Sequence, residues 1–349
     1  MKVAVFCPNL IGDTVMATPT FRALKNGLDG VSLTAVIRPH VAPTLDGSNW
    51  FDDIILFDHR SSRRSDRTLA VIGRLRREQF DLAVLLPNSF RSALVARLAG
   101  IPRRLGYQRH GRGMLLTDVL QHQVDAEGRR IPTPIVETYL KLARRLGCPV
   151  ESNRLELATT TADEAAADRA WAELGLIGAD PVVCLNTGGA FGPAKNWPVE
   201  HFATLARRLA GESGSRVLVV CGPSERENAR AIVAAAGHDR VVSLADRELS
   251  IGLTKACVRR SALLITTDSG PRHFAAAFGT PVISLFGPTH IAWTRTNHPL
   301  AWHVRHPVPC GPCQRPVCPK GHHLCMKELS PEGVHAVARR VLATSATWS

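Results

Sequence analysis

Short apolar runs alternate with longer amphipathic segments through both halves of this 349-residue chain. The runs have the length of buried parallel strands, and the segments between them have the periodicity of helices that cover a sheet. This rhythm predicts an α/β protein with two doubly wound, Rossmann-like lobes. Such lobes bind ligands at the carboxyl ends of their strands, so we expect a central cleft that the two lobes face.

The same pattern predicts where the strands and domains lie. The predicted strands are Val3–Cys7, Ser32–Ile37, Asp53–Phe57, Leu82–Leu86, Val182–Asn186, Arg216–Val220, Arg240–Ser243, Ala262–Thr266 and Pro281–Phe286. Helices are predicted at Thr14–Asn26, Arg67–Gln79, Ser89–Leu98 and Ala162–Leu174, and others begin near Pro198, Ser224, Glu248 and Gly270. A polar stretch near 151–161 separates the halves, which gives domains at 1–155 and 156–330 and a C-terminal helix at 331–349.

The segment from Thr266 to His273 follows one of these apolar runs. It reads as a strand that turns sharply into a helix, so that Ser269 and Gly270 present backbone N–H groups at the helix start. Those donors and the helix dipole suit a diphosphate, and Asp268 and His273 could add contacts to it. The competing interpretation is an ordinary helix cap, which Asp and Ser form in many proteins.

Two more strand ends of the second half carry candidate binding residues. Thr187 and Gly188 open a glycine-rich loop that ends in Lys195, and such a loop lets the backbone and a lysine approach a phosphate. The loop lacks the G-K-[ST] ending of a Walker motif, which favours a bound sugar nucleotide over hydrolysed ATP. Glu225 follows the next strand and could accept ribose hydroxyls, or it is simply an acidic residue of a first helical turn.

Asp13 occupies the first strand-to-helix turn of the other half. A carboxylate there could accept a proton from an attacking hydroxyl, and capping of the following helix is the alternative role. The surrounding sequence has no GxGxxG fingerprint, so we expect no nicotinamide cofactor.

Together these motifs resemble the ADP-heptose:lipopolysaccharide heptosyltransferases of glycosyltransferase family 9, most closely the heptosyltransferase II branch. The resemblance covers nearly the whole chain and rests on the segments at 8–19, 189–195, 267–273, 279–281 and 285–289. It implies the glycosyltransferase-B architecture and an inverting, metal-independent transfer of L-glycero-D-manno-heptose from ADP-heptose to the lipopolysaccharide inner core, without a cofactor.

The resemblance also implies residue roles. It makes Asp13 the base, with Lys195 as a second catalytic residue that holds phosphate together with Ser269 and Gly270, and it places Glu225 at the ribose.

The chain is basic, with a formal net charge of +13, and residues 1–150 hold 22 Lys and Arg against 13 Asp and Glu. Exposed arginines can bind an anionic macromolecule, an anionic glycolipid or a membrane surface, although many are only solvated. Because the expected acceptor carries carboxylates and phosphates, we assign acceptor binding to the arginines of two clusters, Arg60, Arg63, Arg64, Arg103 and Arg104.

Four cysteines, Cys310, Cys313, Cys318 and Cys325, fall within 16 residues beside His322 and His323. Four thiolates could hold zinc or an iron–sulfur cluster, but the spacing matches no common pattern for either. We favour a reduced, proline-rich loop and keep a structural metal as the alternative.

The compartment and partners follow from the same features. No apolar run approaches the roughly 18 residues that a membrane span needs, and Asp13 comes too early for a signal peptide. We expect a cytoplasmic enzyme that could rest on the inner face of the inner membrane. Other candidates are a different glycosyltransferase or sugar-nucleotide epimerase, and a basic nucleic-acid-binding protein, which the low aromatic content of 5% disfavours.

Overall fold

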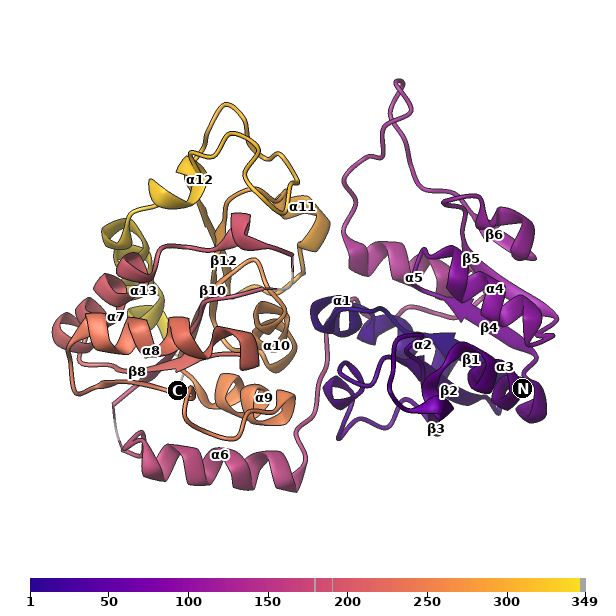
Figure 1. Cartoon of the computed structure of the whole chain (residues 1–349), viewed down its shortest axis with the longest axis horizontal. Helices are drawn as coiled ribbons and strands as arrows, with labels where there is room; N and C mark the ends of the chain where they lie inside the picture. Colours follow the sequence, from indigo (N-terminus) through magenta and orange to yellow (C-terminus); the bar gives the residue numbers. More distant parts are fainter. Residues whose placement is uncertain (179, 190, 346–349) are drawn as a thin grey trace. The chain divides into compact units, whose positions relative to one another are not determined.

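A computed structural model of the chain describes residues 1–178, 180–189 and 191–345. The chain forms two compact units (Figure 1). Residues 1–158 and 292–297 make up the first unit, and residues 159–291 and 298–349 make up the second. Each unit contains one six-stranded sheet in which every strand pairing is parallel. The doubly wound α/β class expected from the sequence is confirmed.

The first unit contains β1 to β6 and α1 to α5. Its strands are β1 (Lys2–Phe6), β2 (Ser32–Ile37), β3 (Asp53–Leu56), β4 (Leu82–Leu85), β5 (Arg103–Tyr107) and β6 (Asp118–Leu120). Its helices are α1 (Ile11–Met16), α2 (Thr18–Gly27), α3 (Thr68–Glu78), α4 (Phe90–Leu98) and α5 (Ile135–Arg145). The sheet order is β3-β2-β1-β4-β5-β6.

Alternate side chains of β1 enter two cores, as a strand buried on both faces requires. Val3 and Val5 pack with Phe21 of α2 and Leu142 of α5, whereas Phe6 packs with residues of α3 and α4 on the other face. Helices therefore cover both faces of this sheet.

The second unit repeats this plan. Its strands are β7 (Val182–Asn186), β8 (Arg216–Val220), β9 (Val241–Ser243), β10 (Leu263–Thr267), β11 (Val282–Phe286) and β12 (Ala301–Arg305). Its helices are α6 (Thr161–Glu173), α7 (Val199–Glu212), α8 (Arg226–Ala236), α9 (Ile251–Arg260), α10 (Pro271–Phe278), α12 (Leu324–Lys327) and α13 (Pro331–Ser345), and α11 (Ile291–Thr294) begins in this unit and ends in the first. The last four residues of the predicted C-terminal helix lie outside the described residues.

The two sheets have the same topology. The second reads β9-β8-β7-β10-β11-β12, so in both units the order by position within the unit is 3-2-1-4-5-6. This order places a topological switch point between β1 and β4 in one unit and between β7 and β10 in the other. Ligands of doubly wound folds bind outside the carboxyl ends of the strands at this point.

The structure corrects some predicted elements. The single helix expected at 14–26 is wrong, because the chain forms α1 and α2 with a break at Ala17. Pro19 lies in the first turn of α2, where a residue without an N–H is tolerated. The strands β5, β6 and β12 and the helix α5 were not predicted.

Candidate active site

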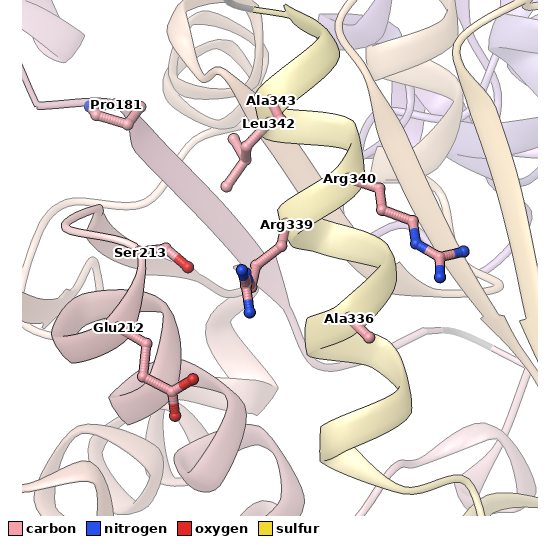
Figure 2. A pocket seen from close by; sticks show the side chains of 8 residues that line it. All are labelled: Pro181, Glu212, Ser213, Ala336, Arg339, Arg340, Leu342 and Ala343. Atoms are coloured by element: carbon pink, nitrogen blue, oxygen red, sulfur yellow. The ribbon is translucent and has the colours of Figure 1, made fainter.

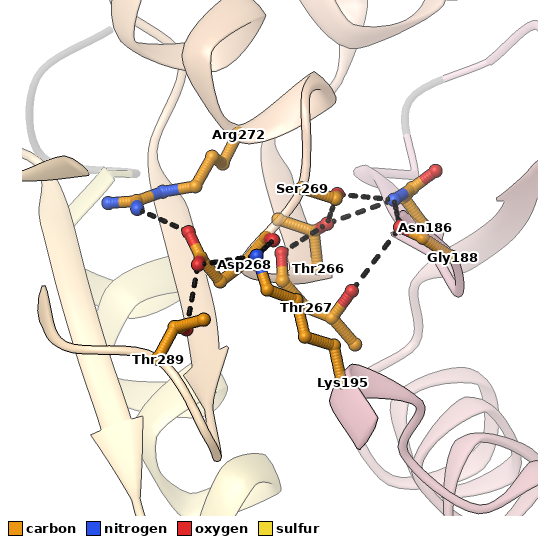
Figure 3. Close-up of polar contacts among 9 residues, drawn as sticks. All are labelled: Asn186, Gly188, Lys195, Thr266, Thr267, Asp268, Ser269, Arg272 and Thr289. Carbon is orange, nitrogen blue, oxygen red and sulfur yellow. Dashed lines mark hydrogen bonds and ion pairs between the residues drawn. The ribbon is translucent and has the colours of Figure 1, made fainter. Parts of the chain in front are cut away.

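The candidate site of the second unit lies where β7 and β10 end, at the switch point. Asn186 is the last residue of β7 and is buried. Its side-chain amide nitrogen lies 3.0 Å from Thr266 Oγ1 and 2.8 Å from Ser269 Oγ, and it also donates to the carbonyl of Gly188 at 3.2 Å (Figure 3). One amide group therefore ties the glycine-rich loop to the β10–α10 turn.

Asp268 is the centre of the cluster in Figure 3. Its carboxylate accepts from Lys195 Nζ at 2.7 Å, from Arg272 at 3.0 Å and from Thr289 Oγ1 at 2.8 Å. Lys195 Nζ also donates to the backbone carbonyl of Asp268 at 2.7 Å. The Asp268 and Arg272 side chains are 5% and 3% exposed, and that of Lys195 is 11% exposed.

The electrostatics of this cluster favour charged Asp268 and neutral His273. Burial by itself would raise the pKa of Asp268, but Arg272 and Lys195 outweigh it and lower that pKa well below its usual value. Burial is the main reason that the pKa of His273 lies well below its usual value, and Arg272 adds to the effect. Two cations against one carboxylate leave the group with a net positive charge.

Backbone donors lie beside these charges. Helix α10 begins at Pro271, with Gly270 as its N-cap and no side chain capping it. Among the described residues, no hydrogen bond is found for the backbone amides of Ser269 and Gly270. The start of α10 therefore combines unpaired N–H groups with the positive end of the helix dipole, which is the arrangement that binds phosphates.

Glu225 and Gly188 lie in direct contact. Glu225 ends the short 3-10 helix Pro223–Glu225 after β8, and its Oε2 accepts from the backbone N–H of Gly222 at 2.8 Å. A Cβ atom added to Gly188 would lie 1.7 Å from Glu225 Oε1. A side chain at this position would therefore displace the carboxylate of Glu225.

In the first unit, Asp13 is the third residue of α1 and is partly buried. The helix begins at Ile11 and its N-cap is Leu10, so the alternative prediction that Asp13 caps the helix is wrong. Tyr139 of α5 is close by, because after burial the Asp13 carboxylate is the next largest cause that raises the pKa of Tyr139 well above its usual value. The carboxylate thus follows β1 at the switch point of its own sheet.

Comparison with known proteins agrees with this layout. The family model of glycosyltransferase family 9 (heptosyltransferase) matches residues 68–324. The chain belongs to glycosyltransferase family 9. It is 27% identical over 343 residues to lipopolysaccharide heptosyltransferase 2 of Escherichia coli, with 96% of each chain covered. It is also 28% identical over 310 residues to lipooligosaccharide heptosyltransferase 2 of Haemophilus ducreyi, covering 84% of this chain and 85% of that protein.

The fold of this family 9 chain also matches a solved relative. The structure of the E. coli ADP-heptose heptosyltransferase II superposes with a TM-score of 0.80 at 26% identity, covering 99% of this chain and all of that one. The chain is therefore a transferase with the glycosyltransferase-B architecture, and the epimerase and nucleic-acid-binding alternatives are not favoured.

The structure groups the predicted residues of the second unit and adds to them. Thr187, Gly188, Lys195, Glu225, Asp268, Ser269, Gly270 and His273 all follow or flank the carboxyl ends of β7, β8 and β10. His273 is 3% exposed and Thr187 is 5% exposed, so both lie behind the surface of the site. Sequence reasoning missed Asn186, Arg272 and Thr289. The spacing of four residues between Asp268 and Arg272 in a helix start was a signal for that pair.

The predicted arginines separate into two groups. Arg60, Arg63 and Arg64 are exposed and follow the carboxyl end of β3. Arg103 and Arg104 are the first residues of β5, so they lie at the amino ends of the strands, opposite to the end at which β3 finishes. Arg103 pairs with Asp118 at 3.0 Å, and Arg104 donates to backbone carbonyls such as that of Leu115 at 2.7 Å. The two groups of arginines therefore do not form one surface at the carboxyl ends of the strands.

The four clustered cysteines carry free thiols, each partly exposed. Burial raises the pKa of Cys325, and the nearby thiols of Cys313, Cys318 and Cys310 add to that shift. Within the described part of the chain, no group of three or more His, Cys, Asp and Glu side chains is arranged to hold a metal ion.

No described helix is long and apolar enough to cross a membrane.

The second unit has a separate pocket at the opposite end of its sheet from the cluster around Asp268. Figure 2 shows it beside α13, where Pro181, Glu212 and Arg339 contribute to its lining. Pro181 precedes β7, so the pocket is at the amino ends of the strands. It is therefore not the site at the carboxyl ends.

Proposed function

We propose that this chain transfers L-glycero-D-manno-heptose from ADP-heptose to the inner core of lipopolysaccharide, with inversion at the anomeric carbon. The proposal rests above all on the cluster around Asp268, which holds two cations and unpaired backbone donors at the switch point of the second unit. A departing nucleoside diphosphate needs this kind of charge stabilisation. The relatives named as heptosyltransferases support the choice of donor and acceptor.

We assign the nucleotide sugar to the second unit. Lys195 has three N–H donors and uses two of them on Asp268, so the third can reach a phosphate oxygen. The backbone amides of Ser269 and Gly270 supply two more donors. Glu225 accepts the ribose hydroxyls, and Asp268 keeps Lys195 and Arg272 in position instead of contacting the ligand itself. Because these groups neutralise the leaving ADP, the transfer needs no metal ion or cofactor.

Asp13 acts as the base in this proposal. Inversion requires one in-line displacement, in which the acceptor hydroxyl attacks the anomeric carbon and gives up its proton. A carboxylate in the first turn of α1, at the switch point of the first unit, is placed at the part of the fold where ligands of doubly wound units bind.

The acceptor contacts belong to Arg60, Arg63 and Arg64. All three are exposed, and no ion pair occupies them among the described residues, so their charges are available to carboxylates and phosphates of the core. We leave Arg103 and Arg104 out of this role because they lie at the amino ends of the strands. The same basic surface would let a cytoplasmic enzyme rest on the anionic inner leaflet that carries the acceptor.

The direct test is a transfer assay with purified protein in the presence of EDTA. ADP-heptose is offered beside ADP-glucose, UDP-glucose and GDP-mannose, and the acceptors are inner-core lipopolysaccharides truncated before each heptose. We expect one heptose to be added to one of these acceptors with ADP-heptose alone as an efficient donor, as seen by mass spectrometry. Transfer from a UDP-sugar or GDP-sugar in its place would refute the proposal.

A further inference from the structure

The cysteine-rich segment 308–327 contacts both loops that hold Asp268. Lys195 comes from the turn after β7, and Thr289 comes from the turn after β11. Residues of segment 308–327 contact each of these turns. This segment can therefore fix the geometry of the turns that carry Lys195 and Thr289.

The contact with the lysine turn uses both backbone groups of Ala194. The N–H of Ala194 donates to the carbonyl of Pro316 at 3.0 Å, and the carbonyl of Ala194 lies 2.6 Å from His323 Nε2. Ala194 is 3% exposed and immediately precedes Lys195 in the 3-10 helix Pro193–Lys195. Since a carbonyl oxygen can only accept, His323 is the donor in this bond.

The fit against this turn is tight. Gly192 has φ 140°, and a Cβ atom added to it would lie 2.6 Å from the carbonyl oxygen of Pro316. Only glycine combines that backbone conformation with such a close approach.

The second loop is held in the same way. The N–H of Gln314 donates to the carbonyl of Pro288 at 2.8 Å, next to Thr289. A Cβ atom on Gly287 would lie 2.3 Å from Met326 Sδ and 3.3 Å from Cys325 Sγ. Segment 308–327 thus fixes the turns that carry two of the donors to Asp268.

We infer that His323 is a positioning residue for Lys195, acting through the carbonyl of Ala194. His323 is partly buried and adopts φ 57°, a left-handed conformation at the N-cap of α12, and its ring reaches the lysine turn through Nε2. Without this hydrogen bond the buried carbonyl of Ala194 loses its partner, the turn shifts, and the ammonium of Lys195 leaves the place where it meets both Asp268 and the diphosphate. This role rests on the proposed function.

The test compares His323→Ala, His323→Gln and His323→Asn with His322→Ala. Glutamine places an amide donor near the position of Nε2, asparagine tolerates the left-handed backbone but is too short, and His322 is the neighbouring histidine, whose Nε2 faces Cys310 Sγ at 3.7 Å instead of the lysine turn. The measurements are the Kd for ADP by calorimetry, KM and kcat for transfer, Tm, and the rate at which Lys195 is acetylated, read by mass spectrometry.

We expect His323→Ala and His323→Asn to raise the Kd for ADP and the KM for ADP-heptose about tenfold, which is the effect of about one lost hydrogen bond. The KM for the acceptor should not change, and Lys195 should be acetylated several times faster. His323→Gln and His322→Ala should stay within about threefold of wild type.

Two results would overturn the inference. One is that His323→Ala and His322→Ala behave alike in ADP binding and Lys195 acetylation, and the other is that glutamine fails to rescue at unchanged Tm. If wild type binds no ADP, the proposed function fails, whereas the acetylation rates still decide whether His323 positions Lys195.

Discussion

The two units share one sheet topology and differ in the polar groups at their switch points. In the second unit, Lys195 and Arg272 surround a buried carboxylate, Asp268. In the first unit, the buried cation is Arg112, which is 0% exposed and forms no ion pair with any described residue. Its guanidinium donates to the carbonyls of Tyr107 at 2.8 Å and Pro87, and to Asn88 Oδ1 at 3.2 Å.

This difference separates two ways of holding charge at the same place in a fold. An ion pair fixes cations beside a ligand site and still leaves a net positive charge, which suits a diphosphate. Arg112 instead donates to surrounding carbonyls and thereby fixes the turn after β4. Burial lowers the pKa of Arg112 to about 10, so Arg112 stays charged at neutral pH. The first unit also has a carboxylate after its first strand, Asp13, and in our proposal that carboxylate acts as the base.

The largest expected effect is the loss of turnover when Asp13 of the first unit is replaced. We expect Asp13→Asn to reduce kcat by about a thousandfold, within the range for a lost general base, because the amide keeps the shape but cannot take the proton. The Kd for ADP should change less than about threefold, since the nucleotide is assigned to the other unit. Steady-state kinetics and calorimetry measure the two quantities, and turnover within tenfold of wild type would remove Asp13 from the mechanism.

Breaking the ion cluster of the second unit should have the largest effect on stability. Asp268→Asn leaves Lys195 and Arg272 buried without their carboxylate, which should cost about 3–5 kcal/mol of unfolding free energy. ADP binding should be lost as well, because Lys195 loses its partner.

The matched control is Asp246→Asn, which removes an exposed partner of Arg230 at 2.6 Å and should cost less than about 1 kcal/mol. Denaturant unfolding measures both variants. Equal losses would mean that the cluster at Asp268 is not held by its charges.

Much of this fold could be predicted from the sequence, and the reasons for the exceptions are physical. β7 and β8 were predicted to the residue because their apolar runs are buried on both faces. β5 begins with Arg103 and Arg104 and contains Gly106, so it has no apolar run to detect.

The site divides in the same way. The sequence pattern predicted the glycine-rich and acidic residues at the strand ends, and it also predicted the helix start at Ser269 and Gly270. The contacts of Asp268 with Lys195 and Thr289 could not be predicted, because Lys195 lies 73 residues away and Thr289 lies 21 residues away in the sequence. Spacing along a chain does not encode contacts that the sheet order creates.

Removing the cation of the first unit should cost less than removing the anion of the second. Arg112→Met removes the guanidinium that donates to the carbonyls of Pro87 and Tyr107 but also removes a buried charge, and these effects oppose each other. We expect a loss of about 2 kcal/mol of unfolding free energy, with ADP binding unchanged. A loss as large as that of Asp268→Asn would show that the two buried cations are held with similar strength.

The smallest effect concerns the pH dependence of stability, to which the partly buried His122 of the first unit and the buried His273 of the second both contribute. Burial is the main reason that the pKa of His122 falls to about 4, and Arg130 and Arg109 add to it; its Nε2 has no hydrogen-bond partner among the described residues. An unfolded histidine has a pKa of about 6.5, so between about pH 6.5 and 4 the unfolded chain binds a proton that the folded chain does not. The contribution of His122 to stability should therefore fall as the pH drops through this window and level off below it.

His122 stacks on Tyr107 with ring centroids 4.3 Å apart, so His122→Phe keeps the stacking and removes the titration. From pH 7 to pH 5, wild type should lose about 1–2 kcal/mol more unfolding free energy than this variant. His273 has a lowered pKa for the same main reason, so both proteins keep a remaining loss in acid from the second unit. Parallel curves for wild type and His122→Phe would mean that His122 takes up its proton in the folded first unit as readily as in the unfolded chain.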